Sequence, residues 1–242
     1  MKISKVTSSD NILIVGFPSN GLIGTFTISY LIHNLDMKQI GELDHPDLPP
    51  TLFVENGEIL APIRIYKKNN IFVIISDLPF DPYLALDFAE LILEYCKKND
   101  IHKIIIVSGM ETINKDPKAP KIYGLVTTQS LEEILYKNQI SKFLAGSIFG
   151  TDAAMISVFR KSKIPALVLY TECHPFFPDP EASIIAITTL AKILNITVDT
   201  TDIQKKMEHL RIQRRNLMEE TIRALQQQNL ENKPPRAPQI YR

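Results

Sequence analysis

Residues 12–24 read Ile-Leu-Ile-Val-Gly-Phe-Pro-Ser-Asn-Gly-Leu-Ile-Gly, an apolar run that ends at a glycine and passes into a turn. A short apolar run closed by turn residues is typical of a buried strand, and the pattern that follows, to about His33, is typical of a helix. We therefore predict strand, turn and helix here. A strand followed by a helix is the repeating unit of α/β proteins, so this stretch indicates the fold class.

Two later runs have the same apolar character. They are Lys103–Val107 and Ala166–Tyr170, and neither alternates between polar and apolar residues. Strands that are buried on both faces lose this alternation, which is typical of parallel sheets covered by helices. We therefore predict an α/β domain with a mainly parallel central sheet.

Helix signals accompany these strands. Asp81-Pro82 and Asp179-Pro180 each place an N-cap residue before a proline in the first turn, and they predict helices that end near Lys98 and Leu194. Between them, the pattern predicts three further elements. A capping box of Ser130 with Glu133 predicts a short helix, which is followed by a strand at Leu144–Ile148 and a helix at Asp152–Lys161.

The stretch 51–76 has a different pattern. Three strand-like runs, Thr51–Glu55, Leu60–Tyr66 and Ile71–Ser76, are separated by Asn56-Gly57 and Asn69-Asn70. Asn-Gly and similar pairs favour tight hairpin turns. We predict an antiparallel hairpin insert in the otherwise parallel sheet.

The chain divides into three parts by composition. Residues 1–200 form the α/β core domain. Residues 201–230 contain no glycine or proline, and apolar residues recur at mostly three- and four-residue steps, which predicts a long amphipathic helix. This stripe comprises Ile203, Met207, Leu210, Leu217, Ile222 and Leu225. Such a narrow stripe can dock on the body of the protein or on a partner.

Residues 231–242 form a proline-rich tail. Pro234, Pro235 and Pro238 oppose helix formation and favour an extended, semi-rigid segment. The tail ends in Ile240-Tyr241-Arg242, a hydrophobic residue, a tyrosine and a third residue whose terminal carboxylate can pair with a cation. Capture of a chain terminus in a pocket is a recurring mode of peptide recognition.

Composition excludes several classes of partner. The 27 Lys and Arg residues balance the 27 Asp and Glu residues, and no block of five like charges occurs, so neither nucleic acid nor an anionic membrane is indicated. Cys96 and Cys173 lie far apart without a CxxC motif, which is typical of a reducing compartment and predicts a cytoplasmic protein. No apolar run approaches the ~20 residues that a membrane-spanning helix needs.

The glycines at 16, 21 and 24 allow two interpretations. Glycines at a junction from strand to helix let the backbone approach a phosphate, as in dinucleotide-binding proteins. However, Pro18 stands where the middle glycine of that motif belongs, and Asp36 follows a helical pattern instead of ending a second strand. The alternative is a tightly packed structural turn.

Other candidate catalytic residues lack partners in the sequence. Glu172, Cys173 and His174 follow a strong strand, but adjacent residues of an extended chain point to opposite sides, so Cys173 and His174 are unsuited as nucleophile and base. The pairs Ser108-Gly109 and Gly146-Ser147 lie outside any G-x-S-x-G elbow. The five histidines show no zinc-ligand spacing. We expect no enzyme activity, no metal and no cofactor.

Four segments together resemble the proteasome-assembly-chaperone family, particularly its archaeal members. They are the turn from Gly16 to Gly24 with Tyr30-Leu31, the strand Ile104–Gly109, the segment Gly146–Gly150 and the stretch Pro178–Ala182. The resemblance covers roughly residues 10–200 and rests on the order and spacing of the segments. It implies a phosphorylase-like α/β fold without an established catalytic site, and a homo-oligomer.

The tail is similar to the hydrophobic-Tyr-X ending of proteasome activators. That resemblance implies a non-enzymatic assembly chaperone or activator that docks on the α-subunits of the 20S proteasome. Ile240 would then be the apolar contact, Tyr241 the wedge and the carboxylate of Arg242 the ionic anchor. The alternative is a phosphorylase-like enzyme or small-ligand-binding protein that holds a phosphate-bearing ligand near Gly16–Gly24.

Overall fold

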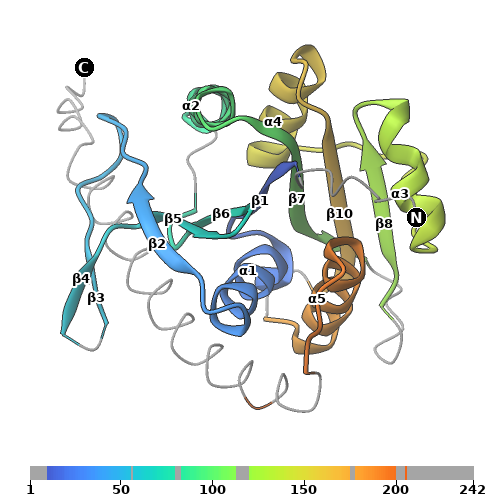
Figure 1. Cartoon of the computed structure of the whole chain (residues 1–242), viewed down its shortest axis with the longest axis horizontal. Helices are drawn as coiled ribbons and strands as arrows, with labels where there is room; N and C mark the ends of the chain where they lie inside the picture. The colour runs from blue at the N-terminus through green and yellow to red at the C-terminus, as the bar shows by residue number, and fades with distance from the viewer. Residues whose placement is uncertain are drawn as a thin grey trace, which may run out of the picture.

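A central sheet of eight strands forms the core of the protein, with helices on both faces (Figure 1). The computed structural model describes residues 10–55, 57–79, 83–112, 120–174, 178–199 and 205. The order of the strands in the sheet is β2-β5-β6-β1-β7-β10-β8-β9. Their bounds are β1 Asn11–Gly16, β2 Lys38–Glu42, β5 Ile63–Lys68, β6 Ile71–Ser76, β7 Ile101–Glu111, β8 Ile122–Val126, β9 Ser141–Lys142 and β10 Ala166–Cys173.

The middle of the sheet is parallel, as the apolar runs predict. β6, β1, β7 and β10 run in one direction, with Leu13 opposite both Phe72 and Ile104. Side chains that alternate along these strands enter two separate apolar clusters, one on each face of the sheet. Burial on both faces explains why the runs lack polar alternation.

The edges of the sheet are antiparallel, so the fold is mixed α/β. β5 pairs antiparallel with β6 and with β2, and β8 pairs antiparallel with β10. The sequence patterns did not predict β2 or β8. Ile40 is the single large apolar residue of β2 and is half exposed, so this edge strand lacks the apolar run that marks a buried strand.

The antiparallel insert is confirmed, but its middle strand is divided. The predicted strand Leu60–Tyr66 is wrong as one element, because β4 (Glu58–Leu60) pairs with β3 (Phe53–Glu55) in a separate hairpin and β5 starts anew at Ile63. Pro62 lies at the break, where its missing N–H prevents a continuous ladder. The β5–β6 turn at residues 69–70 is confirmed, with Asn69 at φ 51°.

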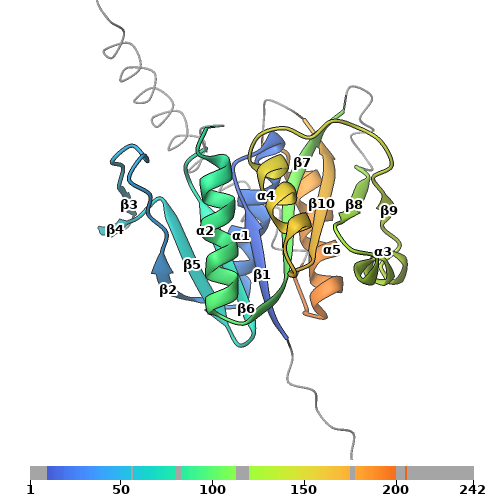
Figure 2. The same ribbon diagram turned by 90° about the horizontal axis from the view of Figure 1, so that it is seen from above.

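Helices cover the two faces in pairs. α1 (Ile23–Asn34) and α5 (Pro180–Leu194) pack on one face, and α2 (Ala85–Lys98) and α4 (Gly150–Lys161) pack on the other (Figures 1 and 2). Two helices begin directly after a short 3-10 helix. η1 (Asn20–Leu22) precedes α1, and η2 (Gln129–Leu131) precedes the short α3 (Glu132–Lys137). A third apolar cluster, built on Phe26, Tyr30 and Ile187, joins α1 to α5.

Of three local predictions, the structure confirms one and contradicts two. Asp179 caps α5 as predicted, because its carboxylate accepts the Ala182 N–H at 3.1 Å. The capping box at Ser130 is wrong, since the Ser130 hydroxyl lies 3.0 Å from that of Thr128 instead. Residues 144–148 form a loop and not the predicted strand; Leu144 is 88% exposed there and has no neighbouring strand to pair with.

Several predictions lie outside the described residues. These are the Asp81-Pro82 cap, the amphipathic helix at 201–230 and the tail at 231–242. The phosphorylase-like character of the fold stays a prediction, and so does the boundary at residue 200 between the core domain and the C-terminal helix. Within the described part of the chain, none of the helices combines the length and apolar character needed to cross a bilayer.

Candidate functional site

The glycine-rich turn after β1 is a packing device. A Cβ atom on Gly16 would overlap the carbonyl oxygen of Gly24, and one on Gly24 would lie 2.6 Å from the carbonyl oxygen of Val107. The start of α1 therefore rests directly on β1 and β7, with no side chain between them. The interpretation as a tight structural turn is confirmed.

The same packing fills the space that a phosphate would need. Residues 21–24 at the start of α1 are buried, and the Asp179 N–H donates to the carbonyl oxygen of Gly21 at 3.1 Å. Atoms of the protein therefore occupy the place beside Gly16 and Gly24 where a dinucleotide would lie. This geometry removes the basis for a phosphate-bearing ligand at the turn.

A cleft of about 300 Å³ opens beside the turn, at the carboxyl ends of β7 and β10. Ligands of open α/β sheets bind at this edge, because the loops that follow the parallel strands converge there. Two pairs that the sequence singled out meet in the cleft, since both Gly109 and Ser147 line it. Asn20 of the glycine-rich turn lines it as well.

Asp152, in the first turn of α4, is the charged centre of the cleft. The hydroxyls of Ser108, from β7, and Tyr170, from β10, lie near its carboxylate, although neither hydroxyl makes a hydrogen bond of normal distance and angle within the described residues. Burial raises the pKa of Asp152, and the two hydroxyls lower it by a smaller amount. Burial and the neighbouring carboxylate also raise the pKa of Tyr170. The residue Asp152 was predicted as part of a helix, but not as part of a site.

The sequence carries one signal for this trio. Tyr170 and Ser108 are polar residues in otherwise apolar strands, and a buried polar side chain normally has a polar partner. Local patterns give no indication that the partner is Asp152, because the three residues come from three elements far apart in the chain. Only the fold brings them together.

The loop before α4 carries exposed apolar side chains. Phe149 lines the cleft and is 81% exposed, and Leu144, on the same loop, is 88% exposed. Phe143, also on this loop, packs inward, with its ring centroid 5.6 Å from that of Tyr170. Exposed large apolar side chains that gather on one surface are typical of protein contact sites.

The cleft suits a hydrogen-bond donor or a cation better than an anion. Asp152 and Glu111 both line it, whereas its described lining includes no lysine, arginine or histidine. A phosphate group would meet like charge here. The geometry therefore supports recognition of a basic or amide group.

Cys173 is buried and His174 is exposed, as expected of neighbours on an extended chain. Cys173 is fully buried at the end of β10, with its Sγ 3.7 Å from the carbonyl oxygen of Met110. The backbone N–H of His174 donates to the Asp179 carboxylate at 2.9 Å, which ties β10 to the cap of α5. Within the described residues, no group of three His, Cys, Asp or Glu side chains is placed to hold a metal ion.

We expect Asp152→Asn to raise the melting temperature near neutral pH. The folded pKa of Asp152 lies above its unfolded value, so ionisation costs more in the folded protein, and stability falls as the pH rises through the folded pKa. The amide cannot ionise and avoids this loss. The gain should vanish in acid, below the unfolded pKa of roughly 4.

Differential scanning calorimetry across pH checks this prediction. Glu90→Gln, which removes an exposed carboxylate from α2, is the matched control and should have little effect at any pH. A melting temperature for Asp152→Asn that is lower than wild type by the same amount at neutral and acidic pH would contradict the prediction.

The fold and the cleft define an α/β protein with a cleft at the carboxyl edge of its sheet and exposed apolar side chains, on the loop before α4, suited to protein contacts. The sequence pattern of the PAC2 family matches residues 13–218, so the chain belongs to the PAC2 family.

Solved structures share this fold. PbaA of Pyrococcus furiosus, described as an archaeal homologue of a proteasome-assembly chaperone, is 30% identical; the match covers 88% of this chain and 95% of PbaA, with a TM-score of 0.79. PbaB of the same organism, described as an archaeal proteasome activator, is 18% identical with a TM-score of 0.73, over 92% of this chain and 96% of PbaB. The latter likeness concerns the fold alone.

A curated relative extends the comparison to another archaeon. An uncharacterised protein of Methanocaldococcus jannaschii is 22% identical over 222 residues, which cover 92% of this chain and 91% of the relative. The shared region therefore spans almost the whole of both chains.

Proposed function

We propose that the protein is a non-enzymatic assembly chaperone or activator of the 20S proteasome, acting in the cytoplasm as a homo-oligomer. The observation that carries the proposal is membership of the PAC2 family together with 30% identity to PbaA over 88% of this chain. The exposed apolar side chains of Leu144 and Phe149, on the loop before α4, support a role in protein contacts.

The proposed contact with the proteasome α-subunits is made by Ile240, Tyr241 and Arg242. Ile240 supplies an apolar contact, Tyr241 a rigid ring and Arg242 a carboxylate for a lysine in the α-ring. The proline-rich residues 231–239 supply reach at roughly 3 Å per residue. Several copies in one oligomer would present several tails, so that weak contacts gain avidity.

A binding experiment tests the function directly. The purified full chain is mixed with isolated proteasome α-rings at micromolar concentration and passed over a sizing column. We expect the two to elute together. Separate elution of the chain and the rings at every concentration tried would overturn the proposal.

We predict a closed homo-oligomer. The hairpin of β3 and β4 supports this, because Val54 and Ile59 are directly opposite each other and are 68% and 70% exposed. Such a pair is a candidate contact between copies. Light scattering should give a mass that is a multiple of the 27.5 kDa protomer. A particle of one protomer at micromolar concentration would refute the prediction.

A second candidate function is the binding of a small ligand, and the cleft around Asp152 is the observation in its favour. Its volume of about 300 Å³ is at the lower end for small-molecule sites. The cleft favours a cationic ligand over the phosphate-bearing one suggested by the glycines. Loss of any measured turnover in Cys173→Ser would favour an enzyme instead.

A further inference from the structure

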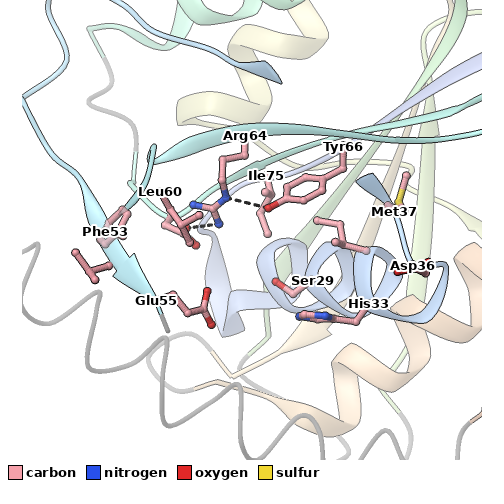
Figure 3. A pocket seen from close by; sticks show the side chains of 13 residues that line it. Ser29, His33, Asp36, Met37, Phe53, Glu55, Leu60, Arg64, Tyr66 and Ile75 are labelled. Carbon is pink, nitrogen blue, oxygen red and sulfur yellow. Dashed lines mark hydrogen bonds and ion pairs between the residues drawn. The ribbon is translucent and has the colours of Figure 1, made fainter. Parts of the chain in front are cut away.

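A second groove, of about 290 Å³, lies between α1 and the β3–β4 hairpin (Figure 3). Apolar side chains from three elements line it: Ile32 on α1, Met37 after α1, and Phe53 and Leu60 on the hairpin. Three carboxylates also line the groove, those of Asp36, Glu55 and Asp77, and the charge of Asp77 is paired with Arg64. The groove therefore combines an apolar lining with negative charge.

A buried ion pair fixes the wall of the groove. Arg64 on β5 and Asp77 after β6 are joined by an Nη2–Oδ2 contact of 2.6 Å, and both side chains are less than 10% exposed. Arg64 also donates to the hydroxyl of Tyr66 at 3.2 Å (Figure 3) and to the carbonyl oxygen of Ala61 at 2.7 Å. These contacts tie the hairpin to the sheet, so the groove is a preformed feature.

The chain leaves α5 next to this groove. The Tyr30 hydroxyl donates to the carbonyl oxygen of Asp199 at 3.0 Å, and the Asn34 amide donates to that of Thr197 at 3.3 Å. Tyr30 and Asn34 are one turn apart on α1, and each follows a residue that lines the groove, Ser29 or His33. The next stretch of chain, from residue 200 onward, therefore begins beside the groove.

That stretch has the chemistry that the groove requires. Residues 202–229 carry the apolar stripe described above and contain six Lys and Arg residues against four Asp and Glu residues, with five of the six basic residues within 202–216. A basic amphipathic segment matches an apolar groove that carries acidic side chains. Ser29 adds a second observation, because its buried hydroxyl lines the groove and makes no hydrogen bond within the described structure.

We propose that residues 202–229 dock in this groove of their own chain, with the apolar stripe, Leu210 included, packed between α1 and the hairpin. Most of the stability of an amphipathic helix in a protein comes from tertiary packing of its apolar face. Docking at this point would fix where the tail at 231–242 leaves the body. The inference does not require that the tail binds a proteasome.

Hydrogen exchange of the full chain, without any partner, tests the inference. We expect the amides of residues 202–229 to exchange at least about tenfold more slowly than those of an unstructured segment. The protection should not change when the protein is diluted. Rapid exchange in the wild type would overturn the inference, and so would protection that falls on dilution, because the groove of a second copy would then be the docking site.

Variants identify the two contacting surfaces. Glu55→Lys, which places a positive charge at the groove, should reduce the protection by about tenfold, and Glu90→Lys on the far face of the sheet should not. On the segment itself, Leu210→Asp should reduce the protection by a similar factor, because it places a charge on the apolar stripe. Asn216→Asp adds the same charge away from the stripe and should leave the protection intact.

Two further outcomes are decisive. Unchanged protection in both Glu55→Lys and Leu210→Asp would overturn the inference, because neither surface would then take part. Loss of α-ring binding in a tail variant that keeps the protection would leave the inference standing, so the proteasome proposal and the docking proposal fail independently.

Discussion

Replacing Tyr241 with alanine is expected to abolish binding of the protein to proteasome α-rings, while its fold and oligomeric mass stay unchanged. A tyrosine ring provides a large contact area with few rotatable bonds, and its hydroxyl finds a polar partner at the edge of a pocket. The loss of about 1–2 kcal/mol per tail is compounded across an oligomer that binds through several tails at once. Pull-down by immobilised α-rings measures this effect.

Two further changes in the tail separate the ring from the charge. Deleting Tyr241-Arg242 removes both and should also abolish binding. Arg242→Ala keeps a carboxylate in the same place and should be tolerated, because the proposed ionic contact uses the carboxylate and not the guanidinium.

Equal binding by wild type and Tyr241→Ala would exclude the tail as the main contact and would direct attention to the body of the protein. The loop with Leu144 and Phe149 is then the first surface to test. If neither protein binds at any concentration tried, the proposed contact with the proteasome is overturned.

Replacing Asp77 with alanine is expected to destabilise the protein by about 3–5 kcal/mol, the usual cost of leaving one charge of a buried ion pair without its partner. Burial alone would lower the pKa of Arg64, but Asp77 and Tyr66 outweigh it and raise the pKa, so the guanidinium stays charged. Chemical denaturation at a fixed protein concentration measures the loss.

The double variant Arg64→Met with Asp77→Leu is the control for this effect. It removes both charges, and apolar replacement of a buried pair is often nearly neutral. We therefore expect most of the lost stability to return. A cost below about 1 kcal/mol for Asp77→Ala would contradict the prediction, since exposed pairs contribute no more than that.

The central strands and most helices could be predicted because their signals are local. β1, β7 and β10 are apolar runs, and Asp179 is an N-cap placed directly before Pro180, so neighbours in sequence supply the evidence. β2 and β8 could not be predicted in this way. Each is a strand through hydrogen bonds to a partner distant in the chain.

The residues of the candidate site also fall into those that local patterns indicate and those that they do not. The pairs Ser108-Gly109 and Gly146-Ser147 could be picked out by their position, and the structure brings Gly109 and Ser147 into one cleft. Asp152 was missed as a site residue. Acidic residues are common in the first turn of a helix because they interact favourably with the helix dipole, so Asp152 gave no sign of a further role. Its burial against Ser108 and Tyr170 has no local signal.

The sequence by itself therefore determined the α/β class and the buried strands at the centre of the sheet, and its three-part division of the chain stays a prediction. Tertiary structure alone decided the antiparallel edges, the contact of Gly24 with β7 and the pairing of Arg64 with Asp77. The physical reason is the range of the interactions. Burial and capping act over a few residues, whereas strand pairing, close backbone approach and charge pairing depend on which distant segments the fold brings within a few ångströms.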